Sequence, residues 1–228
     1  MKSVTVLTSG GLDSTVLLYY VIRHLGIETV FALSFSYGQK HAEELESAVW
    51  QCCQLPEVRE HRIIDIGDFG RLIKTSTLIV EGDKVPDLRD IDEAELAQPS
   101  TYVPNRNMIF LSIAAAFAES HNCEEIYYAA QAHDLYSYWD CTSRFVEKVN
   151  AVLALNRKHQ IRVKAPFVDM PKSAVVKLGA ELGVDFAKTW SCYRGGEFPC
   201  GECPTCCERK KAFREVNLKD PLWETSSR

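Results

Sequence analysis

A glycine-containing turn near the N-terminus carries the residue types that bind phosphate groups. It follows a short apolar run at residues 4–7 and precedes apolar side chains that recur at helical spacing. Adjacent glycines allow a tight turn whose N–H groups face outward, and the following helix directs its positive end at the same point. The pattern predicts an anion site for nucleotide phosphates, formed by Ser9, Gly10, Gly11, Leu12, Asp13, Ser14 and Thr15. An ordinary glycine turn capped by Ser14 is the alternative.

Four cysteines near the C-terminus have the spacing of metal ligands. Cys200, Cys203 and Cys206 are each separated by two residues, and Cys192 lies shortly before them. Four thiolates this close can surround a tetrahedral ion, so we expect structural Zn²⁺ at these positions. An iron–sulfur cluster and a set of free thiols are the alternatives. Cys207 directly follows Cys206 and cannot easily point the same way, so we leave it out of the ligand set.

The turn differs from two common phosphate-binding motifs. It lacks the Lys that directly precedes Ser or Thr in a Walker loop, and it lacks the three spaced glycines of a dinucleotide fingerprint. The form Ser-Gly-Gly-x-Asp-Ser instead resembles the pyrophosphate loop of ATP-pyrophosphatase enzymes, which adenylate a substrate and release pyrophosphate. This resemblance implies ATP as a ligand, with Asp13 orienting the loop or helping to hold Mg²⁺.

Composition limits the class of protein and of partner. The chain has 228 residues, of which 46% are hydrophobic and 25% charged, as expected for a soluble globular protein. No apolar run reaches membrane-spanning length and no secretory leader precedes the first strand, so we expect a cytoplasmic protein with reduced thiols. The net charge of −5 favours a small-molecule substrate, because surfaces that bind nucleic acid are usually basic.

The chemistry-bearing segments must be positioned by alternating strands and helices. Apolar β-rich runs predict strands at residues 4–7, 30–35, 62–66, 125–130 and 161–167, and helical periodicity predicts helices that include 42–53, 108–118, 143–155 and 172–182. This alternation predicts an α/β fold: a parallel five-stranded sheet with helices on both faces. Ligands of such sheets bind beyond the carboxyl ends of the strands, where the turn lies.

Two units are expected along the chain. Residues 1–185 would form a nucleotide-binding α/β domain, and residues 186–228 a small C-terminal zinc-binding segment packed on it. Between the predicted strands, the acidic stretch 81–100 has little periodicity and two prolines. It is predicted to be a solvated surface loop, with a lid over the site as the alternative.

The combination of loop and cysteines, in this order, resembles the 7-cyano-7-deazaguanine synthase (QueC) family, and the likeness extends over nearly the whole chain. The segments that carry it are Ser9–Ser14, Tyr37-Gly38-Gln39-Lys40-His41, Thr101-Tyr102-Val103-Pro104-Asn105-Arg106-Asn107, and Cys192 with Cys200-Gly201-Glu202-Cys203-Pro204-Thr205-Cys206 and Arg209.

The resemblance implies a fold, an activity and partners. The fold would be that of the adenine nucleotide alpha hydrolase-like proteins, with a zinc-bearing C-terminal part, usually as a homodimer. The activity would be a carbon–nitrogen ligation: ATP activates 7-carboxy-7-deazaguanine as an acyl adenylate, ammonia gives the amide, and a second activation gives the nitrile for queuosine biosynthesis. Direct binding of tRNA is not expected.

Carrying the family's pattern onto this chain gives candidate site residues. The candidates for catalysis are Asp13, Ser14, Arg106 and Lys172. Arg106 and Lys172 are included because negative charge develops at the α-phosphorus during the displacement, and a cation can stabilise it. The candidates for substrate binding are Tyr37, Gln39, Arg106, Asn107, Asp134 and Asp140. The two aspartates are included because a carboxylate can accept hydrogen bonds from the N–H groups of a guanine-like edge. For Arg106 and Lys172 an ordinary surface cation is the alternative, and for the aspartates a helix cap.

The chain departs from the family near the expected substrate pocket. Ser137 and Trp139 stand where family members commonly carry Gly and Pro, and Asn105 stands where they carry Gly. These changes leave room for a ligase that joins the same acid to another amine, such as one on a protein, and stops at the amide. Two further alternatives are a tRNA sulfur-transfer or lysidine-type enzyme and a non-catalytic zinc-binding interaction module.

Overall fold

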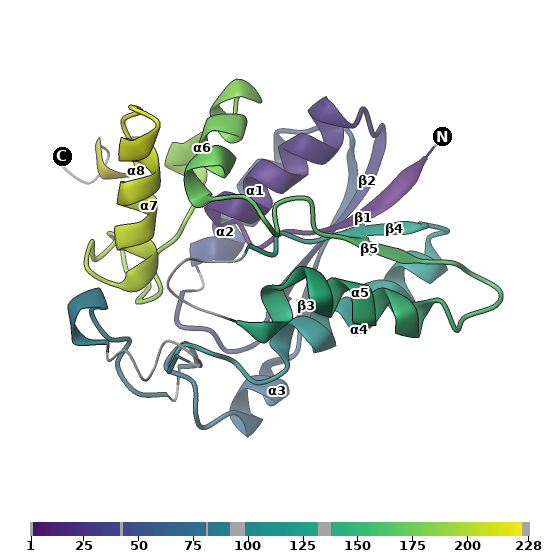
Figure 1. Cartoon of the computed structure of the whole chain (residues 1–228), viewed down its shortest axis with the longest axis horizontal. Coiled ribbons are helices and arrows are strands. Elements are labelled where there is room, and N and C mark those ends of the chain that lie inside the picture. Colours follow the sequence, from purple (N-terminus) through teal and green to yellow (C-terminus); the bar gives the residue numbers. More distant parts are fainter. Residues whose placement is uncertain (1, 42, 81, 92–98, 132–137, 225–228) are drawn as a thin grey trace.

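The computed structural model describes residues 2–41, 43–80, 82–91, 99–131 and 138–224, and shows a single twisted sheet with helices packed on it (Figure 1). The sheet is parallel and its strand order is β3-β2-β1-β4-β5. The predicted α/β class and the five strands are therefore confirmed. The strands are β1 (Ser3–Leu7), β2 (Thr29–Ser36), β3 (Val58–Asp65), β4 (Glu125–Tyr127) and β5 (Arg162–Lys164).

Helices follow the strands in chain order. They are α1 (Leu12–Tyr19), continued by a π-helical turn at Tyr20–His24, α2 (Glu43–Cys53), α3 (Gly67–Leu72), α4 (Arg106–Ser120), α5 (Ser143–Leu153), α6 (Lys172–Glu181), α7 (Pro204–Glu215) and α8 (Pro221–Glu224). Short 3₁₀ turns lie at Leu88–Asp90, Trp139–Cys141 and Phe186–Lys188.

Alternation along the strands divides the hydrophobic core into two layers, because successive side chains of a strand point to opposite faces. On one face, Val30 and Ala32 of β2 pack in a cluster that includes α1, α6 and α7. On the other face, Phe31 and Leu33 pack in a cluster that includes α4 and α5. Figure 1 shows α1 and α6 on one side of the sheet and α4 and α5 on the other, which confirms the prediction of helices on both faces.

Strand boundaries differ from the prediction where burial is incomplete. β3 begins at Val58, four residues before the predicted start, and pairs with β2 as far as Asp65. As an edge strand it is half exposed, so its first half lacks an apolar pattern. β5 ends at Lys164 because residues 165–168 form a turn around Pro166, in which the Val168 N–H donates to the Ala165 carbonyl at 3.2 Å.

The described part of the acidic stretch is packed, in contrast to the solvated loop that was predicted. Val85 is buried, and Asp87 forms an ion pair with Arg194 from the cysteine-bearing segment. The Leu88 N–H also donates to the Glu202 carbonyl at 3.1 Å. Residues 82–91 are thus docked on the C-terminal segment; residues 92–98 lie outside the described part.

Within the residues that the structure describes, no helix combines the length and the apolar character needed to cross a membrane.

Candidate active site and cysteine cluster

The predicted phosphate loop lies at the carboxyl end of β1, in the middle of the sheet, and runs directly into α1. Two serine hydroxyls stabilise its shape. Ser14 Oγ donates to the Gly11 carbonyl at 3.2 Å and accepts from the Ser9 N–H at 3.1 Å, and the Gly11 N–H donates to Ser9 Oγ at 3.2 Å. β1 separates the β2 and β4 branches of the sheet, which is the topological switch point where ligands of such sheets bind.

Gly10 is where this loop meets the rest of the protein. Its φ is +87°, and a Cβ there would lie 1.9 Å from the Glu44 carbonyl oxygen and 2.5 Å from the Ala48 nitrogen. The start of α2 therefore packs directly on the loop, at a distance that only glycine permits. From the other side, the Trp190 N–H donates to the Gly10 carbonyl at 3.1 Å.

A cavity opens beside the loop, and most of the predicted site residues line it. These are Ser9, Gly11, Leu12, Asp13, Ser14, Tyr37, Gln39, Arg106, Asn107 and Lys172. Gly10, Thr15 and Asp140 do not line it: Gly10 contacts α2, Thr15 is fully buried in the first turn of α1, and Asp140 is buried outside the lining. Asp134 lies outside the described residues.

Two cations and an acid meet in this cavity from distant parts of the chain. Lys172, the first residue of α6, forms an ion pair with Asp13 in the first turn of α1. Arg106, the first residue of α4, donates from Nη1 to the Tyr37 hydroxyl at 3.1 Å. Burial raises the pKa of Tyr37, against the opposing effect of Arg106. Both cations are thus placed at helix starts with their heads in the cavity.

Gln39, Asn107 and Asp140 are bonded within the protein. The Gln39 side chain accepts from the Tyr37 N–H at 2.8 Å and donates to the Phe35 carbonyl at 3.1 Å, so its amide holds the loop after β2. Asn107 Nδ2 donates to the Asp140 carbonyl at 3.4 Å. Asp140 is 3% exposed, and burial raises the pKa of its carboxyl group.

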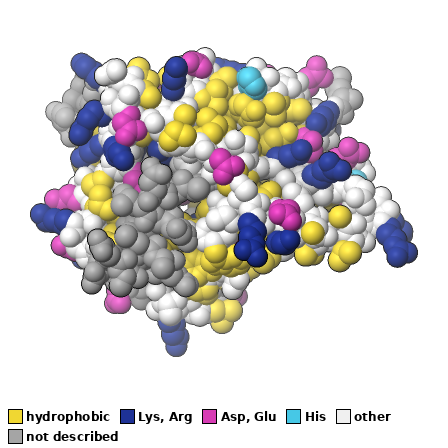
Figure 2. Space-filling view, viewed as in Figure 1, with side chains coloured by type: hydrophobic (Ala, Val, Ile, Leu, Met, Phe, Trp, Pro, Cys, Tyr) yellow, Lys and Arg dark blue, Asp and Glu magenta, His cyan; other side chains and the backbone are white. Residues whose placement is uncertain are grey.

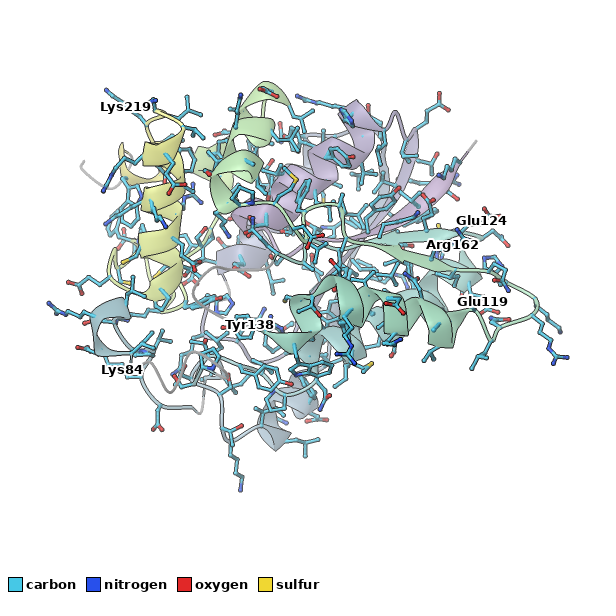
Figure 3. All side chains as sticks on the ribbon, viewed as in Figure 1. Lys84, Glu119, Glu124, Tyr138, Arg162 and Lys219 are labelled. Atoms are coloured by element: carbon cyan, nitrogen blue, oxygen red, sulfur yellow. The ribbon has the colours of Figure 1, made fainter. Side chains whose placement is uncertain are left out.

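Aromatic side chains form the remaining walls. Phe35, Tyr37, Phe110, Tyr128, Trp190 and Tyr193 line the cavity, and they give it flat apolar surfaces on which a planar ring can stack. The predicted aromatic segment is described from Tyr138 onward. There, Trp139 Nε1 donates to the Tyr102 hydroxyl at 2.8 Å, and the Tyr138 hydroxyl lies 2.6 Å from Thr101 Oγ1. Figure 3 shows Tyr138 in the region between α5 and α7, far from Glu124 and Arg162 at the other end of the sheet.

His41 and Glu44 also line the cavity, although neither is among the predicted site residues. Burial and the charge of Arg106 lower the pKa of His41 to about 4. Burial raises the pKa of Glu44 to about 8. Glu44 follows the Tyr37–His41 motif in the acidic first turn of α2, so its spacing from that motif was the available signal.

The four predicted cysteines come together in the structure. The Sγ atoms of Cys192, Cys200, Cys203 and Cys206 all lie within 4.8 Å of one another, and the Cys200 and Cys206 sulfurs are 4.0 Å apart. The Cys203 N–H points at Cys200 Sγ, at 3.3 Å, as in sites where backbone donors support thiolate ligands. This four-sulfur set fits a metal ion that takes tetrahedral ligands. Cys207 Sγ instead faces the carbonyl oxygens of residues 201 and 202, outside the set.

The cysteine segment is also part of the cavity wall. Ser191, Tyr193 and Thr205 line the cavity, and each is a close sequence neighbour of a cysteine of the cluster. The Thr205 hydroxyl donates to the Ser191 carbonyl at 2.6 Å, which ties the start of α7 to residue 191. A metal ion in the cluster would therefore hold one wall of the cavity in place.

Arg209 fixes this segment from within. It is fully buried on α7, and its guanidinium forms a two-pronged ion pair with Asp220 at 2.7 and 2.9 Å. It also donates to the Phe186 carbonyl at 2.9 Å and to Thr189 Oγ1 at 2.7 Å. Arg209, which belongs to the sequence motif, therefore stabilises the fold and does not line the cavity.

Comparison with known proteins assigns the family. The family model described as Queuosine biosynthesis protein QueC matches residues 2–217. The 7-cyano-7-deazaguanine synthase of Caldicellulosiruptor saccharolyticus is 45% identical over 222 residues, which cover 97% of this chain and 95% of that protein. The protein of the same name from Archaeoglobus fulgidus is 45% identical over 223 residues, covering 97% of this chain and 90% of its own length.

Among solved structures, the fold matches that of a 4-thiouridine synthetase in complex with RNA and bound ATP. The TM-score is 0.51 at 16% sequence identity, and the match covers 99% of this chain and 53% of that one. At this identity the likeness concerns the fold alone. The sequence match over nearly the whole length is what classifies the protein: the chain belongs to the QueC family, and it is an enzyme of the carbon–nitrogen ligase class.

Proposed function

We propose that this enzyme uses ATP to convert 7-carboxy-7-deazaguanine and ammonia into 7-cyano-7-deazaguanine, through an acyl adenylate and an amide, for queuosine biosynthesis. The observation that carries the proposal is the meeting of the Ser9–Ser14 loop, Arg106 and Lys172 in one aromatic-walled cavity. Relatives named for this synthesis are 45% identical to the chain in alignments that cover 97% of it.

The first step is the activation of a carboxylate, which is a poor electrophile. The loop N–H groups and the N-terminus of α1 bind the β- and γ-phosphates of ATP. A carboxylate oxygen of the substrate attacks the α-phosphorus, the bond to the bridging oxygen breaks, and pyrophosphate leaves with that electron pair. Lys172 lines the cavity beside the loop, and we assign to it the stabilisation of the charge that develops at the α-phosphate.

A divalent cation fits beside the loop. Asp13 Oδ1 is buried and has no hydrogen-bond partner among the described residues, while Oδ2 is paired with Lys172. A carboxylate oxygen in this state suits Mg²⁺, which neutralises phosphate charge when it is bound. For the cysteine cluster we propose Zn²⁺, because four thiolates in a closed set favour that ion in a structural role.

The purine-like ring of the substrate has a natural place among the aromatic walls. We propose that it stacks there, with Arg106 and Tyr37 at its polar edge. In this arrangement residues 1–185 supply the nucleotide site, and residues 186–228 supply the zinc-bearing wall. The four reduced cysteines suit the cytoplasm, where we place the enzyme.

The proposed substrate is a small molecule, without direct tRNA binding. On the face shown in Figure 2, Lys and Arg side chains are scattered among acidic ones and form no continuous basic patch. We also propose a homodimer. Met108, Trp139 and Val152 expose 40%, 44% and 66% of their surface around an apolar groove between α4 and α5, and a second copy would cover this surface.

A second candidate function is ligation of the same acid to a different amine, such as one on a protein, ending at the amide. Trp139 favours it, because its bond to Tyr102 builds a bulky indole into the loop that leads to Arg106. The two candidates share the adenylation step and differ in the product.

The test supplies the purified enzyme with 7-carboxy-7-deazaguanine, ammonia and ATP. We expect AMP, exchange of labelled pyrophosphate into ATP, and a product with the mass of the nitrile. Accumulation of amide alone would favour the second candidate, and release of ADP without exchange would refute adenylation. Lys172→Met should slow the exchange by roughly 10²-fold, whereas Lys177→Met, on an exposed position of the same helix, should not.

A further inference from the structure

Glu44 places a carboxyl group beside the phosphate loop. It stands in the first turn of α2 and lines the cavity, with 15% of its side chain exposed. Its Oε1 lies 3.4 Å from the position that a Cβ on Gly11 would occupy. Because the α2 backbone packs on Gly10, this carboxyl group is held where the loop and the cavity meet.

Within the described part of the chain, this carboxyl group has no permanent cation as a partner. Among the described residues its ion-pair contact is with His41, whose Nε2 lies 3.6 Å from Oε2. His41 is neutral at pH 7, because burial and Arg106 lower its pKa to about 4. The other acids nearby are engaged: Asp13 pairs with Lys172, and Glu43 Oε1 accepts from the Gly196 N–H at 2.9 Å. In the part of the structure that is described, Glu44 therefore has no permanently charged side chain within ion-pair distance, while Arg106 and Lys172 line the same cavity and act on it from further away.

The charges around Glu44 tune its basicity. Burial raises its pKa to about 8, the negative groups Asp13 and Glu43 act in the same direction, and Arg106 and Lys172 oppose them. Two tyrosines with raised pKa values, Tyr37 and Tyr193, complete the ionisable groups of the cavity near His41. An ordinary carboxylate is far too weak a base to deprotonate ammonium, but proton transfer comes close to balance when the two pKa values approach each other.

From this geometry we propose that Glu44 is a catalytic residue that binds the ammonium ion and accepts its proton. The inference rests on the proposed function. Ammonium pairs with the carboxylate form of Glu44, which a pKa of about 8 leaves as roughly one molecule in ten at pH 7. One N–H bond breaks as the proton passes to that carboxylate. The nitrogen lone pair then forms the C–N bond to the acyl carbon, the acyl C–O bond breaks, and AMP leaves with that electron pair. The second proton is released to water as the amide forms.

The test compares Glu44→Gln with Glu46→Gln, which changes an exposed acid on the same helix. Glutamine keeps the shape of the side chain and removes its basicity. With ammonia at pH 7, Glu44→Gln should lower the rate of amide formation by roughly 10²-fold or more, while pyrophosphate exchange continues and Glu46→Gln matches the parent. The defect should narrow as pH rises, because neutral ammonia then comes from solution.

A second nucleophile separates proton transfer from positioning. Hydroxylamine is largely neutral at pH 7, so Glu44→Gln should form the hydroxamate at nearly the parent rate. An equal loss with both nucleophiles, or a defect independent of pH, would overturn the proposal. Glu44→Asp should restore part of the ammonia-dependent rate if the acid–base role is correct. If the parent shows no pyrophosphate exchange, the proposed function fails; if the parent is active and Glu44→Gln equals it with ammonia, only this inference fails.

Discussion

Replacing Gly10 with alanine tests how the phosphate loop is built into the fold. The substitution carries two costs. A non-glycine residue at φ +87° costs roughly 1–2 kcal/mol. The new Cβ would also lie 1.9 Å from the Glu44 carbonyl oxygen, and that backbone atom can move only with α2. Overpacking of this kind costs about 1–3 kcal/mol. We therefore expect a total loss of about 2–5 kcal/mol in the free energy of unfolding.

Gly26→Ala is the matched control. Gly26 also has a positive φ, +67°, but nothing lies within 4 Å of its added Cβ. It should lose only the conformational part, about 1–2 kcal/mol. Urea denaturation measures both variants, with the midpoint shifting and the slope unchanged. Nucleotide binding, followed by calorimetry, should weaken in Gly10→Ala and not in Gly26→Ala. Equal stability of the two variants would show that α2 does not press on the loop as described.

Three other substitutions probe the buried charge, the metal and the pH response. Arg209→Met should lower the free energy of unfolding by about 3–5 kcal/mol, because it leaves the buried Asp220 carboxylate without its partner. Arg214→Met, at an exposed position of the same helix, should change it little. A small loss for Arg209→Met in urea denaturation would contradict the buried ion pair. Cys203→Ser should reduce bound zinc, measured by mass spectrometry of the metal, from one equivalent to near zero, and full retention would remove Cys203 from the ligand set. The folded-state pKa of Glu44 lies above its ordinary value, so its stabilising contribution is present below about pH 4.5 and is lost as pH rises to about 8. As pH rises over that range, the free energy of unfolding of Glu44→Gln should therefore increase relative to that of the parent, by at most about 1.4 kcal/mol per pH unit. A difference between the two proteins that does not change with pH would contradict the raised pKa of Glu44.

Features encoded by neighbouring residues were predictable from the sequence. The strand, turn and helix around Ser9–Ser14 lie together in the chain, and so do the last three cysteines. The parallel sheet followed from the alternation of strands and helices, and the structure confirms it. The edge strand β3 was predicted too short because half of its side chains face solvent.

Contacts between distant residues were not predictable in the same way. The pairing of Asp13 with Lys172 joins positions 159 residues apart. Gln39, predicted to bind substrate, lines the cavity, and its amide is also bonded to the backbone on both sides, which a motif cannot reveal. Glu44 gained its position and its raised pKa from burial against the loop, which depends on how α2 packs.

The hydrogen bond from Trp190 to Gly10, with the wall formed by Ser191, Tyr193 and Thr205, has a consequence for biosynthesis of the chain itself. On the ribosome the loop emerges long before residues 190–205, so its cavity stays open on one side until those residues have been made. A chain released early would carry the phosphate loop without a closed pocket. Synthesis of residues 190–205 thus determines when the cavity of the newly made protein can close.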